Sequence, residues 1–214
     1  MSVSRKVEMR VYRPLVILLG GSDGTGKSTI GIELAKRMDI STQIGTDMIR
    51  EVMRSCVSEK MLPVLHTSAI LAADLAPVHY KHPEIYGFIE QARQMKGALE
   101  AIIHRAIVEA RDVIVDGVHL LPGIIEVDTS QVRLHHFIII VSDAEEHKLR
   151  ILGQGEHRSR YKIANFVRGR AFQQFLTEQA IGNGCHVVQN RELYETVELI
   201  AGIVREYGDT GHDK

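Results

Sequence analysis

The chain has 214 residues, 44% of them hydrophobic and 25% charged, which fits one globular domain spanning residues 1–214. Since 26 lysines and arginines balance 27 aspartates and glutamates, a general binder of nucleic acid or of a membrane surface is disfavoured. The two cysteines, Cys56 and Cys185, lack metal-ligand spacing, which favours reduced thiols and a cytoplasmic location. The apolar runs are too short to cross a bilayer.

The first predicted strand, residues 15–19, is a continuous apolar run, as is typical of strands covered on both faces of a parallel sheet. A helical pattern follows at residues 29–38. Between them, residues 21–28 match G-x-x-x-x-G-K-[ST], at the place between strand and helix that a phosphate-binding loop requires. The glycines allow the loop to turn its N–H groups toward phosphate oxygens.

Each residue of this loop has an expected role in nucleotide binding. Lys27 would place its charge on the transferring phosphates, and the Ser28 hydroxyl would be a Mg²⁺ ligand. The expected nucleotide-binding residues are Gly21, Ser22, Asp23, Gly24, Thr25, Gly26, Lys27, Ser28 and Thr29. Because the chain has neither an N-K-x-D guanine-reading sequence nor an L-S-G-G-Q transporter sequence, a compact phosphotransferase using ATP and Mg²⁺ is favoured.

A weaker strand at residues 43–45 leads into a short predicted helix that carries charged residues on one face. Asp47, Arg50 and Arg54 are spaced by three and four residues. Asp47 could accept the proton of an attacking hydroxyl or hold a Mg²⁺-bound water, and the arginines could bind carboxylate or phosphate by bidentate contacts. The alternative is a helix-capping aspartate followed by two solvated arginines.

Residues 56–86 interrupt the strand–helix pattern with three prolines, and we expect a helical hairpin or flap that binds the substrate. Residues 88–110 then show apolar positions at helical spacing over about six turns. The next predicted strand, residues 113–115, ends at Asp116, where a carboxylate could reach Mg²⁺ as in other parallel sheets. The alternative for Asp116 is a turn-forming Asp-Gly pair.

The last third of the chain contains two more predicted strands, a basic segment and a final helix. The strands are residues 137–141 and 186–188, and the helix is residues 192–207. Residues 153–170 begin at a glycine and are rich in arginine, so we expect a lid whose Arg158 and Arg160 reach the transferring phosphates. A solvated basic helix is the alternative. The alternation of strands and helices predicts an α/β fold with a parallel sheet flanked by helices.

The motifs together resemble the archaeal 2-phosphoglycerate kinase family, a group of P-loop kinases related in fold to nucleoside monophosphate kinases. The resemblance lies in the phosphate loop, in T-D-M-I-R-E-V-M-R at residues 46–54, in L-H-T-S at residues 65–68 and in V-D-G-V-H at residues 115–119. It implies ATP-dependent phosphorylation of a hydroxyl on a small phosphorylated carboxylic acid. Relatives implied by the resemblance include kinases of the mevalonate pathway of isoprenoid biosynthesis, which act on the 5-hydroxyl of mevalonate 3-phosphate.

The resemblance also implies acceptor-pocket residues at His66, Thr67, Ser68 and His119. The chain departs from the family pattern at Asp23, where the family often has Ser, and at Asp116, where it often has Glu. Family members usually have a further domain before the first strand, and its lack here favours the mevalonate-phosphate kinases.

The sequence thus predicts a small-molecule kinase with Lys27, Asp47, Arg158 and Arg160 as catalytic residues. A metal site of Ser28, Asp47 and Asp116 and an anionic substrate are expected, and a homodimer is left open. Two other functions remain as alternatives. A polynucleotide kinase would need a groove richer in basic and aromatic side chains than a chain with 5% aromatic residues offers. A nucleotide-switched binding module would need no acceptor pocket.

Overall fold

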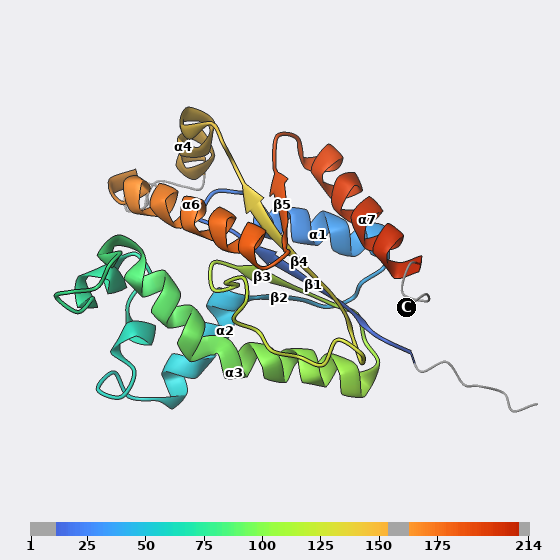
Figure 1. The fold of residues 1–214 in the computed structure, drawn as a ribbon, viewed down its shortest axis with the longest axis horizontal. Coiled ribbons are helices and arrows are strands. Elements are labelled where there is room, and N and C mark those ends of the chain that lie inside the picture. The colour runs from blue at the N-terminus through green and yellow to red at the C-terminus, as the bar shows by residue number, and fades with distance from the viewer. Residues whose placement is uncertain (1–11, 154–162, 210–214) are drawn as a thin grey trace, which may run out of the picture.

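The computed structural model describes residues 12–153 and 163–209 and shows a parallel sheet between two layers of helices (Figure 1). The strands are β1 (Leu15–Gly20), β2 (Gln43–Gly45), β3 (Val113–Gly117), β4 (Arg133–Ile140) and β5 (His186–Gln189). Their order in the sheet is β2-β3-β1-β4-β5, and all neighbours pair in parallel. The predicted α/β fold is therefore confirmed, and so is each predicted strand.

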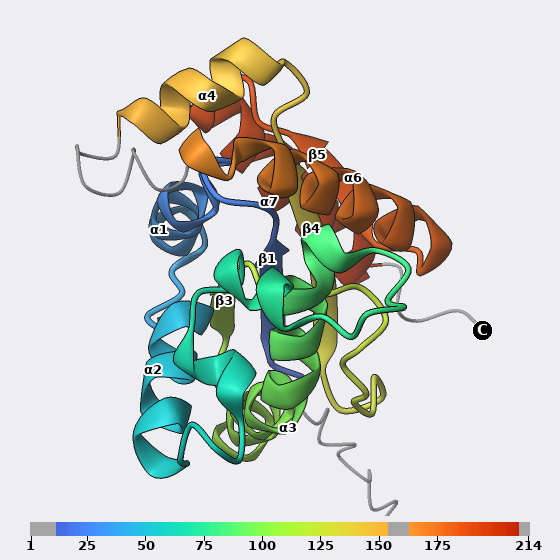
Figure 2. The same ribbon diagram turned by 90° about the vertical axis from the view of Figure 1, so that its left-hand side faces the viewer.

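Helices cover both faces of this sheet. They are α1 (Lys27–Met38), α2 (Thr46–Cys56), α3 (Tyr86–Glu109), α4 (Ala144–Leu152), α6 (Phe166–Gly182) and α7 (Leu193–Asp209). Helices α1 and α7 lie together on one face, whereas α3 and α6 lie on the other (Figures 1 and 2). In the described ranges, 12–153 and 163–209, no helix is long and apolar enough to span a bilayer.

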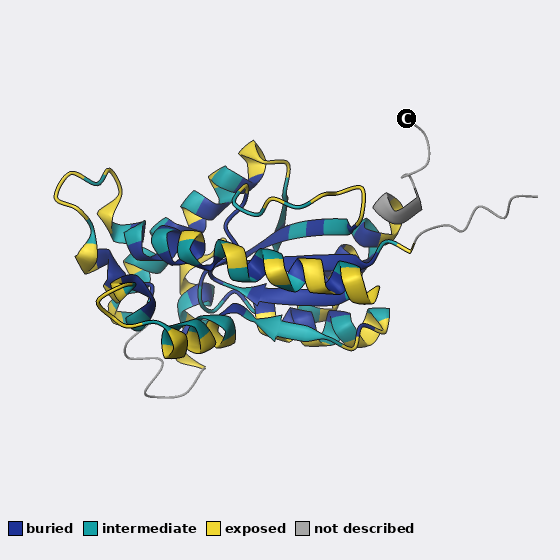
Figure 3. Cartoon of the chain, turned by 90° about the horizontal axis from the view of Figure 1, so that it is seen from below, coloured by how far each residue is buried: buried dark blue, intermediate teal, exposed yellow. Residues whose placement is uncertain are grey.

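The strand side chains alternate between these two layers, because successive residues of a strand point to opposite faces. On β1, Ile17 and Leu19 pack with α1 and α7, whereas Val16 and Leu18 pack with α3. Figure 3 shows the consequence, with the central strands buried and the outer faces of the helices exposed. Burial on both faces explains why the strands are continuous apolar runs.

The segment between α2 and α3 differs from the expected helical hairpin. It contains three short 3₁₀ helices, η1 (Pro63–His66), η2 (Leu71–Leu75) and η3 (Pro83–Ile85), beside the amino-terminal half of α3 (Figure 2). Proline is the first residue of η1 and of η3. Because proline has no N–H group and clashes with the preceding turn, it begins short helical turns but does not continue a long helix.

Residues 154–162 of the expected lid lie outside the described residues, but its last residues belong to α6, a regular helix of 17 residues. Val52, which the apolar spacing of α2 would place in the core with Ile49 and Met53, is 63% exposed. Of these three side chains, Ile49 and Met53 pack against the apolar cluster that includes the side chains of β3 and α3.

The carboxyl ends of the strands determine where a site can form. The pairing of β1 with β3 sets Gly20 opposite Gly117, and the pairing of β2 with β3 sets Gly45 opposite Asp116. The loops after β1, β2 and β3 therefore meet at one edge of the sheet, which is where ligands bind in doubly wound folds.

Candidate active site

The glycine-rich loop joins the central strand β1 to helix α1. Gly26 has a φ of 89°, in the left-handed region that glycine adopts without strain, and it is followed directly by the first residue of the helix. The Lys27 ammonium donates a 2.6 Å hydrogen bond to the carbonyl oxygen of Ser22, so the side chain folds back over the loop. This is the geometry of a phosphate-binding loop at a helix N-terminus.

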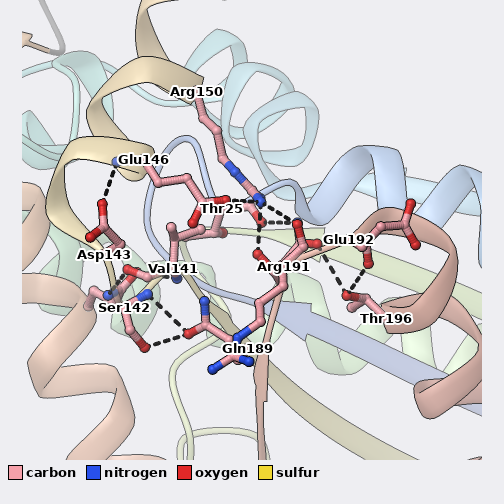
Figure 4. A network of polar contacts seen from close by, with 12 residues as sticks. Thr25, Val141, Ser142, Asp143, Glu146, Arg150, Gln189, Arg191, Glu192 and Thr196 are labelled. Atoms are coloured by element: carbon pink, nitrogen blue, oxygen red, sulfur yellow. Dashed lines mark hydrogen bonds and ion pairs between the residues drawn. The ribbon is translucent and has the colours of Figure 1, made fainter.

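Two side chains from distant segments hold the backbone of this loop. His147 on α4 bonds through Nε2 to the carbonyl oxygen of Asp23 (2.6 Å), and burial lowers the pKa of His147. The Asn190 side chain, after β5, donates to the carbonyl oxygen of Thr25 (2.8 Å). Figure 4 shows how Arg150 reaches from α4 toward Thr25 and the loop after β5, where its guanidinium donates to the carbonyl oxygens of Asn190 and Arg191.

Asp116 lies at the end of β3, beside the loop's serine. The Ser28 hydroxyl donates to Oδ2 of Asp116 (2.5 Å), and the Gln43 amide donates to Oδ1 (2.8 Å). Asp116 is buried, so its carboxylate oxygens need such hydrogen-bond donors in place of water. Two oxygen ligands at this place fit Mg²⁺, which binds proteins through one or two such groups together with phosphate oxygens.

In the described part of the chain, no group of three or more His, Cys, Asp or Glu side chains is arranged to hold a metal ion. Ser28 and Asp116 can supply part of a coordination shell that a nucleotide would complete.

Two cavities adjoin at this edge of the sheet. The first, of about 360 Å³, is lined by the phosphate loop, the start of α2 and the end of β3, including Lys27, Ser28 and Asp116. The second, of about 440 Å³, is lined by α2, α3 and the segment between them. Asp23 and Asp47 line both cavities. A group bound in the second cavity would therefore lie next to a nucleotide bound in the first.

Asp47 lies in the first turn of α2, but it does not cap the helix. The N-cap residue is Gly45, and it makes no side-chain capping bond. The alternative interpretation of Asp47 as a capping residue is therefore excluded by the helix geometry. Asp47 is exposed and faces both cavities, as a group that acts on an acceptor hydroxyl should.

Arg50 lies one turn further along α2 and lines the second cavity. Its guanidinium donates to the carbonyl oxygens of Leu65 (3.3 Å) and Thr67 (2.5 Å). Its Nε is buried and has no hydrogen-bond partner in the described structure. Because a buried unpartnered N–H group is costly, Arg50 is suited to bind an anionic group that enters the cavity.

The other expected acceptor residues divide into two groups. Ser68 lines the second cavity, and its hydroxyl accepts a hydrogen bond from the Leu71 amide (3.2 Å). Thr67 contributes its carbonyl oxygen to Arg50. Arg54 instead pairs with Glu51 (3.4 Å) at the surface, and His66 bonds to the carbonyl oxygen of Val57 (3.0 Å). Of the two arginines predicted to bind the acceptor, the structure brings only Arg50 to the cavity.

His119 follows β3 and is almost fully buried at the wall of the second cavity. Its Nδ1 lies 2.8 Å from the Thr46 hydroxyl, and its Nε2 lies 3.0 Å from Oε1 of Gln91. Burial lowers the pKa of His119 to about 4, so the ring is neutral at physiological pH. Both ring nitrogens of His119 thus have hydrogen-bond partners within the protein.

The expected catalytic arginines Arg158 and Arg160 lie outside the described residues. The two arginines at the end of the expected lid do have described contacts. Arg168 donates to the carbonyl oxygen of Ile70 (3.1 Å) and pairs with Asp74 (3.0 Å). Arg170 donates to the carbonyl oxygens of Val141 (2.6 Å) and Ser142 (2.9 Å). These two arginines fasten α6 to neighbouring segments.

Four of the residues that organise the site belong to no sequence motif. Gln91 carries a signal in the sequence, because it is a polar residue within the apolar stripe of α3. No local pattern marks the others, which contact residues far away in the sequence. They are Gln43, His147 and Asn190.

The phosphate loop follows the central strand of a parallel sheet, and its serine is bonded to a carboxylate of the neighbouring strand β3. These features define this chain as a P-loop protein of the kinase type. It is 34% identical over 217 residues to the 2-phosphoglycerate kinase of Thermococcus kodakarensis, covering 97% of this chain and 72% of the relative. The chain belongs to the 2-phosphoglycerate kinase family.

Other curated relatives have the same name. The 2-phosphoglycerate kinase of Pyrococcus furiosus is 36% identical over 197 residues, and the match covers 90% of this chain and 65% of the relative. The corresponding protein of Methanocaldococcus jannaschii is 34% identical over 199 residues, covering 91% and 64%. The chain thus spans slightly less than two thirds of the length of these two relatives.

No protein-family model matches the chain. Among solved structures, a gluconokinase from Sinorhizobium meliloti matches with 14% identity and a TM-score of 0.49, covering 95% of this chain and 99% of that one. A shikimate kinase from Acinetobacter baumannii matches with 13% identity and a TM-score of 0.47, covering 92% and 96%.

Proposed function

We propose that this chain transfers the γ-phosphoryl group of ATP to a hydroxyl of a small phosphorylated carboxylic acid. The observation that carries the proposal is the pair of adjoining cavities that share Asp47. One cavity has the phosphate loop, and the other has an arginine with a free donor. A donor and an acceptor bound side by side need little further motion before an in-line transfer.

The phosphate loop would bind the triphosphate through its backbone N–H groups, and Lys27 would neutralise charge on the transferring group. Ser28 and Asp116 would hold Mg²⁺, which reduces the negative charge of the phosphate oxygens when it is bound. Asp47 would orient the acceptor hydroxyl or accept its proton. Arg50 would bind an anionic group of the acceptor through its buried Nε–H and an adjacent NH₂ group of the guanidinium.

The names of the relatives support 2-phosphoglycerate as the acceptor. This molecule has one carboxylate, one phosphate and one free hydroxyl. Mevalonate 3-phosphate belongs to the same chemical class and is the alternative acceptor. The described residues that line the second cavity include one arginine and the acids Asp23, Asp47 and Glu51. They therefore provide a cationic partner for one anionic group of the acceptor.

An acceptor screen tests the proposal. ADP release would be measured with Mg²⁺ and ATP in the presence of 2-phosphoglycerate, mevalonate 3-phosphate, mevalonate, glycerate or an oligonucleotide with a free 5′-hydroxyl, and products would be identified by ³¹P NMR. We expect turnover with 2-phosphoglycerate and much less with glycerate. Turnover with the oligonucleotide alone would indicate a polynucleotide kinase, and nucleotide binding without any turnover would indicate a binding module.

A further inference from the structure

Gln91 is an amide side chain at a fully buried position of α3. A buried amide is costly unless its donors and its acceptor are all paired. Its amide nitrogen donates to the carbonyl oxygens of Val64 (2.5 Å) and Thr67 (2.9 Å). Its oxygen lies 3.0 Å from Nε2 of His119. All the polar atoms of Gln91 are therefore used. Gln91 and its partner His119 line the second cavity, and Thr67 directly precedes Ser68, which also lines it.

These contacts determine the direction of each hydrogen bond. Since the Gln91 nitrogen donates to two carbonyl oxygens, its oxygen must be the acceptor from His119. The neutral His119 ring then has its proton on Nε2, which leaves Nδ1 as an acceptor. The hydroxyl of Thr46 must donate to Nδ1. The result is a directed chain from Thr46 through His119 and Gln91 to the carbonyl oxygens of the segment between α2 and α3.

Each end of this chain lies next to a residue of the proposed acceptor site. At one end, the carbonyl oxygen of Thr67 accepts hydrogen bonds from both Gln91 and Arg50. At the other end, Thr46 is the fully buried first residue of α2 and directly precedes Asp47. The hydrogen bond to His119 holds the Thr46 side chain at the start of α2.

We propose that Gln91 is a positioning residue. It fixes Arg50 through the shared carbonyl oxygen of Thr67, and it fixes Asp47 through His119 and Thr46. The proposal rests on the proposed function, because it gives Arg50 and Asp47 their roles. A single buried amide thereby couples the residue that binds the acceptor's anionic group to the residue that meets its hydroxyl. The chain is neutral throughout, so it adds rigidity without adding charge to a cavity that already contains three acids.

The two ends predict different kinetic effects. Gln91→Met keeps the size of the side chain but leaves the Thr67 carbonyl held by Arg50 alone. We expect the acceptor KM to rise about tenfold and kcat to fall severalfold, because His119 also loses its acceptor, while the KM for ATP stays within about threefold of its original value. Thr46→Val removes the hydroxyl next to Asp47. We expect kcat to fall about tenfold, with a much smaller change in the acceptor KM.

Gln94→Met is the matched control, because Gln94 lies one turn further along α3 and, among the residues that the structure describes, its amide bonds only to the neighbouring Glu90 side chain. We expect this variant to keep all three kinetic constants. Thermal melting of each variant separates a loss of folding from a change in the site. If Gln91→Met and Thr46→Val alter the acceptor KM, kcat and the KM for ATP by the same factor, the positioning role is refuted.

A second measurement does not depend on activity or on any variant being folded. Side-chain ¹⁵N NMR of the wild-type chain at pH 7 should show His119 protonated at Nε2 and unprotonated at Nδ1. A proton on Nδ1 would overturn the chain of hydrogen bonds. If the NMR result is as expected but the wild type phosphorylates none of the tested acceptors, the proposed function fails while the hydrogen-bonded chain stands. Faster exchange of the His119 Nε2 proton with solvent in Gln91→Met would further support the hydrogen-bonded chain.

Discussion

The hydroxyl of Ser28 lies 2.5 Å from Oδ2 of Asp116, although 88 positions separate the two residues in the sequence. The parallel pairing of β1 with β3 brings them together, because it places the end of each strand at the same edge of the sheet. Gln43 from β2 satisfies the second carboxylate oxygen. Three neighbouring strands thus contribute to the place where, under the proposed function, a nucleotide-bound metal ion would be held.

The side chain of Lys27 is the first that we expect to be essential. In Lys27→Ala, the charge over the phosphate loop is lost, and phosphoryl transfer should fall by about 10³-fold or more. Steady-state kinetics with saturating ATP and acceptor would measure this. Lys36→Ala removes an exposed lysine of the same helix and should leave turnover unchanged. Near-normal turnover in Lys27→Ala would refute the assignment of this loop to catalysis.

Asp47→Asn tests the group shared by the two cavities. If Asp47 orients or deprotonates the acceptor hydroxyl, kcat should fall by about 10²–10⁴-fold with little change in the acceptor KM. The melting temperature should stay nearly constant, because Gly45 and not Asp47 is the N-cap of α2. An unchanged kcat would remove Asp47 from the mechanism.

Arg50→Lys keeps the positive charge but loses the planar guanidinium and its Nε donor. We expect the acceptor KM to rise about ten- to a hundredfold, since one charge-assisted bidentate contact is worth about 1.5–3 kcal/mol. The KM for ATP should hardly change.

Arg54→Lys is the matched control, because Arg54 lies on the same helix but pairs with Glu51 at the surface. Kinetics with 2-phosphoglycerate and with glycerate would measure both variants. An effect of Arg50→Lys on ATP binding alone would contradict the role given to this arginine.

The central part of the site could be predicted because it follows local rules. A glycine-rich pattern marks the loop before Lys27, and the end of an apolar run marks Asp116. The three-residue spacing of Asp47 and Arg50 is enough to place them on one side of a helix. These expectations depend on residues that are close in sequence.

The rest of the site depends on contacts between distant segments. The amide of Asn190 and the carbonyl oxygen of Thr25 are 165 positions apart, and no spacing rule relates them. For a similar reason, the sequence leaves open whether the basic residues leading into helix α6 form a lid or a helix. The basic residues at its start are typical of a lid, whereas Arg168 and Arg170 bond to backbone carbonyl oxygens of other elements. In the sequence, a side chain that hydrogen-bonds to the backbone of a distant segment cannot be distinguished from a solvated one.

Gly117 should not tolerate a side chain. It has a φ of 154°, and a Cβ atom there would lie 1.8 Å from the Thr46 hydroxyl oxygen. Gly117→Ala should destabilise the fold by roughly 2–5 kcal/mol and lower the melting temperature by about 5–15 °C. Gly97→Ala in α3, where nothing lies within 4 Å, should maintain or raise stability and serves as the control. Equal melting temperatures for the two variants would contradict this.

Stability should fall in mild acid. Burial lowers the pKa values of His119, His135 and His136 to about 4 each, whereas an unfolded histidine titrates near 6.5. Between pH 6.5 and 4, the unfolded chain therefore binds protons that the folded chain does not, so the free energy of unfolding decreases as the pH falls.

Urea unfolding at pH 7.5 and pH 5 would measure this decrease as a lower midpoint at pH 5. His135→Gln removes one of these buried histidines and should make the midpoint less dependent on pH. If the wild-type midpoint is the same at both pH values, these histidines are not buried as described.

The bonds from His147 and Asn190 to the phosphate loop have one more consequence. They hold the carbonyl oxygens of Asp23 and Thr25, and in a planar trans peptide the next N–H points the opposite way. The N–H groups of Gly24 and Gly26 are thereby oriented before any ligand arrives. A loop already in its bound shape loses little conformational entropy on association. Pyrophosphate or ATP should therefore bind in a single fast step, with a rate that follows ionic strength and shows no slow rearrangement.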